Sequence, residues 1–276
     1  MYDSHLYTKL KQNEYKLPKD LKTSDKIIDI MLSNLSSTDS ILRDTIAYHI
    51  FSEWLVIKDN LTIHQKMRIY NYSVNKKNLL FKIDKIDSDA VFQRSFLALI
   101  IALLLENNKI HAFLNDKKIE KIFILLNELL KKEQNMLSFV EGKGWSHCIA
   151  HTADALDELI YQPTIKNSDV KIIMNSISDF YKTNTVILTG EEDERLSNII
   201  ITALFMKKIS YEEVTNWLIT LAESIPNLLP EIPLINIKQF TQTLLIKLSV
   251  LKYKVNFKDF PIVNRYINVS KNNLDL

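Results

Sequence analysis

The sequence predicts an all-α fold: paired helices in a HEAT-like repeat array, forming one α-α superhelix over residues 1–276. Three observations predict it. The 276 residues include only 3 glycines and 6 prolines. Folds with many strands need tight turns rich in these two residues, so the composition favours helices joined by short polar loops. The other two observations are helical spacing of apolar residues along most of the chain and a weak internal repeat.

Helical periodicity defines ten segments. The first begins near Ser24 as its N-cap, and the second follows Asp39 and runs through Trp54. Pro226, Pro230 and Pro233 are expected to break the chain before the last segment. The remaining helices are predicted at 61–74, 88–106, 117–132, 144–161, 168–182, 191–207, 210–224 and 236–254.

The internal repeat is marked by acidic residues followed by arginine near the start of a helix. Arg43 and Arg94 are 51 residues apart, and Arg94 and Arg195 are 101 apart, which is one period of about 50 and then two. The skipped position falls near Trp145, directly after Gly142 and Gly144. A period of this length holds about two helices, as in HEAT-type repeats.

Charge and cysteine content restrict the class of protein. The net charge is +2, and the lysine pairs alternate with acidic or apolar residues, so no nucleic-acid partner is indicated. Cys148 is the single cysteine, which fits a reducing compartment. Residues 1–16 lack an apolar signal-peptide stretch. The longest apolar run, 96–105, is shorter than the roughly 20 residues that span a bilayer, so we expect a buried helix and a cytoplasmic protein without a transmembrane segment.

The helix predicted at 144–161 carries an unusual set of polar side chains. His147, His151, Asp154 and Glu158 follow a spacing of i, i+4, i+7 and i+11, which places them in one stripe. The opposite stripe is mostly apolar and should face the core. The predicted core residues are Trp145, Ile149, Leu156 and Leu159 of this helix, together with Phe96, Leu99, Ile100 and Leu103.

Three interpretations of this stripe stay open. His147, His151 and Asp154 could bind Zn²⁺ or Mn²⁺ and support a metal-dependent hydrolase, although the glutamate of the zinc-protease motif is missing. The same residues could line a metal-free ligand groove, or they could be purely structural. Cys148 is more typical of a small buried hydrophobe than of a nucleophile.

The repeated arginines allow two roles. If they occupy equivalent positions on successive inner helices, they could bind a peptide or a small anionic ligand on a concave surface. They could instead pair with neighbouring acidic residues and stabilise the stack, which is the favoured role. The predicted ligand groove comprises Arg43, Asp44, Arg94, Trp145, His147, His151, Asp154 and Arg195.

Several segments resemble the bacterial family known as domain of unknown function 2785. They are residues 42–54, 91–96, the string Gly144-Trp-Ser-His with Ala150-His151 and Ala153-Asp154, and residues 192–196. Lys143 departs from the arginine expected before the Gly-Trp pair. The resemblance extends over roughly residues 10–250 and implies a soluble helical protein without an established activity, so it leaves open whether the protein is an enzyme. A helical-repeat binding module is the leading prediction, with the hydrolase and a ligand-free scaffold as alternatives.

Overall fold

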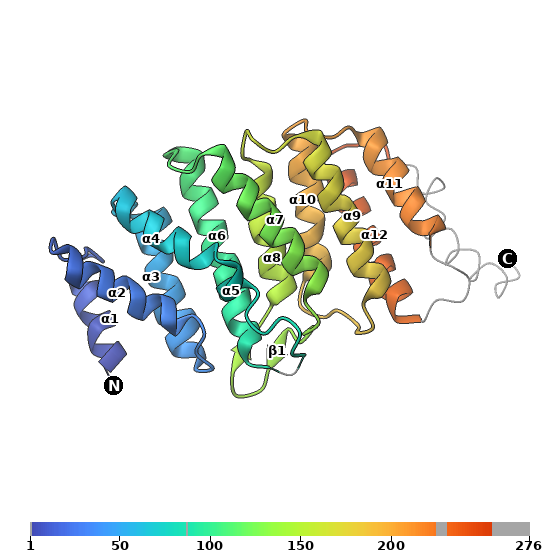
Figure 1. Cartoon of the computed structure of the whole chain (residues 1–276). Helices are drawn as coiled ribbons and strands as arrows, with labels where there is room; N and C mark the ends of the chain where they lie inside the picture. Colours follow the sequence, from blue (N-terminus) through green and yellow to red (C-terminus); the bar gives the residue numbers. More distant parts are fainter. Residues whose placement is uncertain (1, 87, 225–230, 256–276) are drawn as a thin grey trace, which may run out of the picture. The chain divides into compact units, whose positions relative to one another are not determined.

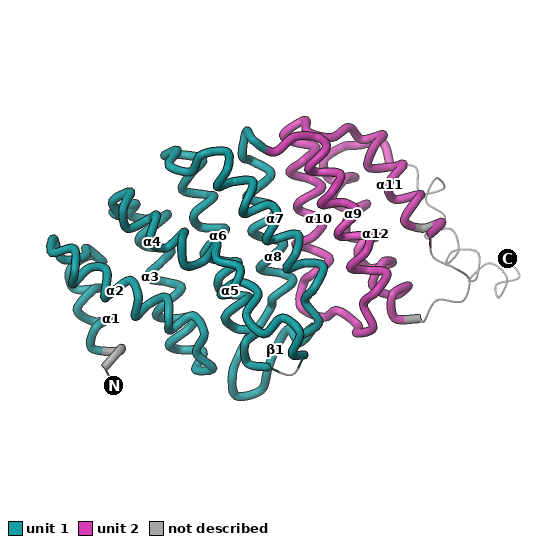
Figure 2. The backbone as a smooth tube through the Cα atoms, viewed as in Figure 1, with its two compact units in different colours: residues 1–164 teal, residues 165–276 magenta. Residues whose placement is uncertain are grey.

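The computed structural model describes residues 2–86, 88–224 and 231–255, most of which lie in helices joined by short loops (Figure 1). Among these residues the only strands form one small two-stranded sheet, so the prediction of a mainly helical protein is confirmed. Contacts divide the chain into two compact units, residues 1–164 and 165–276 (Figure 2).

Unit 1 contains a hairpin of two short strands, with helices before and after it. One continuous helix is made of η1 (Ile41–Tyr48), α3 (His49–Ser52) and η2 (Glu53–Ile57). The strands are β1 (Phe139–Val140) and β2 (Gly144–Trp145). The other helices are α1 (Tyr2–Gln12), α2 (Leu21–Asn34), α4 (Ile63–Ser73), α5 (Lys76–Leu79), α6 (Ala90–Ile110), α7 (Asp116–Lys132) and α8 (Cys148–Ile160).

Unit 2 is wholly helical in its described part. Its elements are α9 (Asn167–Thr183), α10 (Glu192–Phe205), α11 (Tyr211–Glu223) and α12 (Glu231–Val250). Its core is formed where α9, α10 and α12 pack on one another. Tyr181 and Phe240 are fully buried there, with ring centroids 4.9 Å apart.

Local hydrogen bonds explain where several helices begin. The Asp20 carboxylate accepts from the Thr23 backbone N–H, so α2 starts three residues before the predicted cap at Ser24. Thr62 and Gln65 form a capping box at the start of α4, close to the predicted boundary.

The central helix of unit 1 is α6, which packs most extensively on α8. Every residue from Phe96 to Leu105 is buried, as predicted for this apolar run. Its length and composition would also suit a membrane span, and it is the one helix of that kind in the described part of the chain. Of its 18-residue apolar stretch, 89% is buried inside the fold, so α6 has the features of a core helix.

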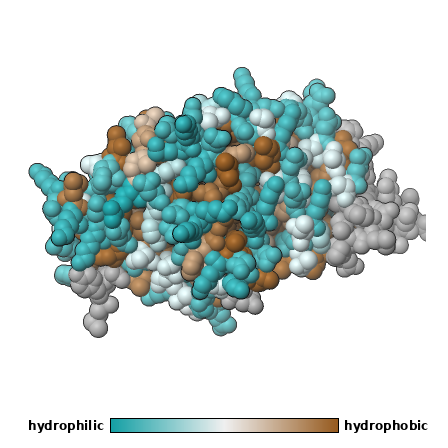
Figure 3. Space-filling view, viewed as in Figure 1, coloured by the Kyte–Doolittle hydropathy of each residue, from teal (hydrophilic) through white to brown (hydrophobic). Residues whose placement is uncertain are grey.

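Unit 1 presents a mainly hydrophilic surface in the view of Figure 3, where apolar side chains appear as separate patches. Beneath it, Ile149, Leu156 and Leu159 of α8 are buried, which confirms their predicted place in the core. Phe96, Leu99, Ile100 and Leu103 of α6 are buried as well.

The η1 segment is a π-helix, which is wider than an α-helix and much rarer. In a π-helix each N–H bonds to the carbonyl five residues back, and such segments are frequent at functional sites. Here the pattern extends over Ile41–Tyr48 and recurs over Glu53–Ile57. Arg43, Asp44 and Tyr48 therefore project from an unusually wound part of the helix.

Hydrogen bonds between helices join positions about 50 residues apart. The Asn107 amide donates to the Leu55 carbonyl at 2.6 Å, and the Gln162 amide donates to the Leu105 carbonyl at 3.1 Å. Asn107 lies near the C-terminal end of α6 and Gln162 lies just beyond α8, while their acceptors belong to η2 and α6. In unit 2, the Asn236 amide donates to the Val186 carbonyl at 2.8 Å.

Two predicted boundaries are wrong. The helix predicted at 144–161 begins only at Cys148, because residues 139–145 form a hairpin instead. The last helix begins at Glu231, so Pro233 lies in its first turn, where the missing N–H has no intrahelical acceptor to lose. Pro226 and Pro230 lie outside the described residues. The helices α1 and α5 were not predicted.

Candidate functional site

A short hairpin precedes α8, and several buried side chains hold it in place. Phe139 pairs with Trp145 and Val140 pairs with Gly144 in an antiparallel arrangement. Gly144 has a φ of 82°, and a Cβ there would lie 3.0 Å from the Ser40 Cβ. Any other residue would therefore meet both backbone strain and a steric clash. Gly142 and Gly144, which precede this helix in the sequence, belong to the hairpin.

Arg43 holds this hairpin from within. Its side chain is 0% exposed, and Nη2 donates to the carbonyls of Lys143 at 2.8 Å and of Trp145 at 3.3 Å. Nε lies 2.7 Å from the Asp44 carboxylate, and Nη1 donates to the Ser37 carbonyl at 2.8 Å. Burial lowers the pKa of the Arg43 guanidinium, and the Asp44 charge opposes that shift.

Aromatic rings support the same guanidinium. Its central carbon lies 4.1 Å from the centroid of Phe92 and 4.9 Å from that of Phe96, both on α6. Cation–π contacts of this kind are favourable where water is excluded. Arg43 thus joins η1, α6 and the hairpin.

Serine side chains fix the base of the hairpin. The Ser146 hydroxyl donates to the Leu137 carbonyl, and its N–H donates to the Ser138 carbonyl at 2.8 Å. The Ser95 hydroxyl of α6 donates to the Ser146 carbonyl and lies 2.7 Å from His151 Nδ1. Because the hydroxyl has one proton, His151 Nδ1 must carry the proton of the second bond.

A buried ion pair holds the segment that begins at Glu133 and leads into the hairpin. Arg94 and Glu133, both 0% exposed at their side chains, bond in a bidentate manner at 2.6 and 2.8 Å. Glu133 also accepts from the Asn135 N–H at 2.9 Å and from the Cys148 thiol at 3.1 Å. Burial raises the pKa of the Cys148 thiol well above its usual range, and the Glu133 charge adds to the effect; both disfavour the nucleophilic thiolate.

Aromatic side chains lie on the outer surface of this anchored hairpin. We call Phe139, Trp145 and His147 the aromatic ledge. Trp145 stacks on His147 with centroids 4.4 Å apart and planes at 17°, and it meets Phe139 edge-on at 5.0 Å. Trp145 is 48% exposed and Phe139 is 55% exposed. The prediction that Trp145 belongs to the core is wrong, because its backbone is strand and not part of the apolar face of α8.

The two histidines occupy different environments. His147 is the N-cap of α8 with a φ of 45°, a left-handed conformation that costs energy for a residue with a side chain. His151, one turn into α8, is 7% exposed and packs edge-on against Phe96 at 5.4 Å. The imidazole centroids are 5.6 Å apart. Strained backbone that its surroundings hold in place is a frequent feature of functional sites.

The carboxylates of the predicted stripe follow on α8. Asp154 is half-buried one turn beyond His151. Glu158 forms an ion pair with Lys109 of α6 at 2.6 Å, and burial raises the pKa of the Glu158 carboxyl despite that cation. Within residues 2–86, 88–224 and 231–255, no group of three or more His, Cys, Asp and Glu side chains is arranged to hold a metal ion.

Unit 1 therefore contains seven of the eight predicted groove residues. Six of them lie around the hairpin and on α8: Arg43, Asp44, Trp145, His147, His151 and Asp154. The seventh is Arg94. Arg43 and Arg94 are fully buried and bonded within the fold, in keeping with the structural role favoured from the sequence. Arg195 belongs to unit 2, where Nη2 lies 3.4 Å from Glu191. Sequence reasoning missed Ser95, Glu133 and Phe139. The Gly-x-Gly spacing at 142–144 was the one signal for a turn there.

Helices around a buried core, with one anchored hairpin that carries exposed aromatic side chains, define a mainly helical protein. The chain belongs to the family described as Protein of unknown function (DUF2785), whose model matches residues 79–246. This confirms the resemblance noted from the sequence, over a shorter range than the expected 10–250. No curated protein and no solved structure matches the chain.

Removing the Trp145 side chain should affect stability little. We expect Trp145→Ala to lower the free energy of unfolding by about 1 kcal/mol or less, since only the ring contacts of an exposed side chain are lost. The matched control is Trp54→Ala, which removes a side chain that is 0% exposed and should cost about 3–5 kcal/mol. Urea denaturation measures both, and equal losses would contradict the exposed position of Trp145.

Proposed function

We propose that this protein is a helical-repeat binding module with two-helix units of about 50 residues. The hydrogen bonds from Asn107 to Leu55 and from Gln162 to Leu105 support the period, because each joins equivalent ends of successive inner helices. An array of this kind presents one face of each unit to a ligand while the other face packs against neighbours.

The aromatic ledge is the proposed binding surface, and the observation that carries the proposal is the exposed Trp145–His147 stack on a hairpin fixed by buried side chains. Tryptophan and tyrosine are enriched at binding surfaces because they contribute large apolar area at low entropic cost. A rigid backbone lowers that cost further, since little order is lost on binding.

A peptide fits this surface better than a small anion. The donors of Arg43 and Arg94 already bond to backbone carbonyls, Asp44 and Glu133, so they are not directed at a ligand. Asp154 adds negative charge one turn beyond His151 on α8. Stacking on Trp145 and hydrogen bonds from imidazole need no net charge on the ligand.

A random-peptide display library tests the proposal. Selection on the wild-type protein should enrich a sequence motif, and the enriched peptides should bind at least tenfold more weakly to Trp145→Ala, as expected for the loss of a central aromatic contact. Trp217→Phe, in unit 2, is the matched control and should bind as the wild type does. Failure to enrich any motif, or equal binding by Trp145→Ala, would contradict the proposed surface.

The metal-dependent hydrolase stays a prediction, and metal analysis of protein purified without an affinity tag checks it. If His147, His151 and Asp154 bind Zn²⁺ or Mn²⁺, then His147→Ala and His151→Ala should each abolish stoichiometric uptake, because one of three ligands is lost. His64→Ala, an exposed histidine of α4, is the control. Wild-type protein that takes up no metal would rule out the hydrolase and leave the peptide proposal intact.

A further inference from the structure

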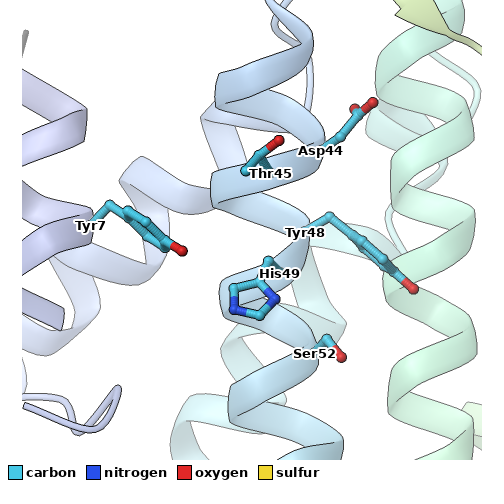
Figure 4. Close-up of a pocket in the computed structure, with 6 residues that line it drawn as sticks. All are labelled: Tyr7, Asp44, Thr45, Tyr48, His49 and Ser52. Carbon is cyan, nitrogen blue, oxygen red and sulfur yellow. The ribbon is translucent and has the colours of Figure 1, made fainter. Parts of the chain in front are cut away.

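A cavity of about 470 Å³ lies beside the η1–α3 helix, on the part of unit 1 that also includes α1 (Figure 4). Its volume is within the range of small-molecule binding sites. Tyr7 reaches into it from α1, and Tyr48 extends on the other side of the helix, where its ring meets Phe96 edge-on at 6.2 Å. The lining residues are Tyr7, Asp44, Thr45, Tyr48, His49 and Ser52.

The lining offers almost no net charge to a ligand. Among the described residues that line it, Asp44 is the one acidic residue, and that carboxylate is 2.7 Å from Arg43 Nε, so most of its charge is already compensated. None of these described lining residues is a lysine or an arginine. An anionic ligand would lie beside Asp44 without a cation, and a cationic ligand would have to compete with Arg43 for the carboxylate.

Hydroxyl groups dominate the remaining polar atoms. Tyr7, Thr45, Tyr48 and Ser52 each supply a group that both donates and accepts hydrogen bonds. Together with the Asp44 oxygens and one imidazole, they match a ligand whose own groups also donate and accept.

The imidazole of His49 is held in place from behind the cavity. Its Nε2 lies 3.1 Å from the Tyr15 hydroxyl, and the two rings meet edge-on with centroids 5.6 Å apart. Burial raises the pKa of Tyr15 to about 12, so this hydroxyl keeps its proton. His49 Nε2 also lies 3.8 Å from the Glu53 carboxylate.

We propose that this cavity binds a neutral, polyhydroxylated ligand of sugar size. The ring of Tyr7 supplies apolar surface for the C–H groups of such a ligand, and the surrounding hydroxyls and carboxylate take its hydroxyl groups. The proposal concerns a second site and does not depend on the peptide proposed for the aromatic ledge.

Saturation-transfer NMR with D-glucose, D-galactose, D-mannose, N-acetyl-D-glucosamine and D-ribose tests it on the full chain. At least one of these sugars should bind, and Tyr48→Phe and Ser52→Ala should each weaken its binding about three- to tenfold, as expected for the loss of one hydrogen bond. Tyr72→Phe, on α4 and outside the lining, is the matched control and should bind as the wild type does. Circular dichroism confirms that all three variants are folded.

Charged analogues make the test sharper. Glucose 6-phosphate and glucosamine should bind more weakly than glucose, because neither charge finds an uncompensated partner in the cavity. The proposal is overturned if none of the five neutral sugars binds, if Tyr48→Phe and Ser52→Ala both bind as tightly as the wild type, or if a charged analogue binds more tightly than its neutral parent.

Discussion

Arg94→Ala is expected to lower the free energy of unfolding by about 3–5 kcal/mol, because it leaves the Glu133 carboxylate buried without its cation. The carbonyls of Phe81 and Lys82 lose their donor in the same variant. Urea denaturation followed by circular dichroism measures the loss. Asp29→Ala is the matched surface control. Its pair with Arg68 is largely exposed, so we expect a loss of about 1 kcal/mol or less.

Cys148 provides a second readout for the same substitution. The thiol is buried against Glu133 and is the only cysteine in the chain, so it should react with a thiol reagent slowly in the native wild-type protein. In Arg94→Ala the segment around Glu133 loses its anchor, and the labelling rate should rise. A double variant, Arg94→Met with Glu133→Leu, removes both charges and should be more stable than Arg94→Ala. An unchanged stability in Arg94→Ala would contradict the anchoring role.

Arg43→Ala has the other large expected effect. It leaves the carbonyls of Ser37, Lys143 and Trp145 without their donor, and an unsatisfied buried polar group costs about 1–3 kcal/mol. We expect a total loss of about 3 kcal/mol or more in the free energy of unfolding. Arg43→Lys should recover only part of it, because an ammonium group cannot reach several acceptors in a fork and stack on two rings.

The hairpin should respond more strongly than the rest of unit 1. In Arg43→Ala, amide hydrogen exchange should increase most over residues 137–147, since Arg43 fixes two of their carbonyls. Arg195→Ala, whose pair with Glu191 is partly exposed, is the matched control and should leave stability within about 1 kcal/mol. Equal exchange at the hairpin in wild type and Arg43→Ala would show that other contacts position it.

The sequence was sufficient for most of the longer helices and for most of the core, although α1 and α5 were missed. Apolar spacing predicted the buried faces of α6 and α8, because an amphipathic or wholly apolar helix has few ways to exclude water from these side chains. The run from Phe96 to Leu105 is the clearest case. The arginines were recognised as a set; Arg43 and Arg94 are buried, whereas Arg195 is partly exposed.

The aromatic ledge could not be predicted in the same way. Trp145 has the right spacing for the apolar face of a helix, yet two glycines and the bonds from Arg43 and Ser146 place it in a strand. The bonds from Arg43 connect residues about 100 positions apart, so no local pattern contains them. Arg43, which fixes the hairpin, also lies outside the segment that matches the family, residues 79–246.

The indole N–H signals of the three tryptophans test the binding surface most directly. Trp54 donates its indole N–H to the Tyr15 carbonyl at 2.7 Å and Trp217 donates to Ser178 at 2.8 Å, and neither belongs to the ledge, so both serve as internal controls. A peptide enriched by display is titrated into ¹⁵N-labelled protein, with signals assigned through Trp145→Phe and Trp217→Phe. We expect the Trp145 signal to shift to saturation while the Trp54 and Trp217 signals stay in place. A saturating peptide that leaves the Trp145 signal unmoved would contradict the proposed binding surface.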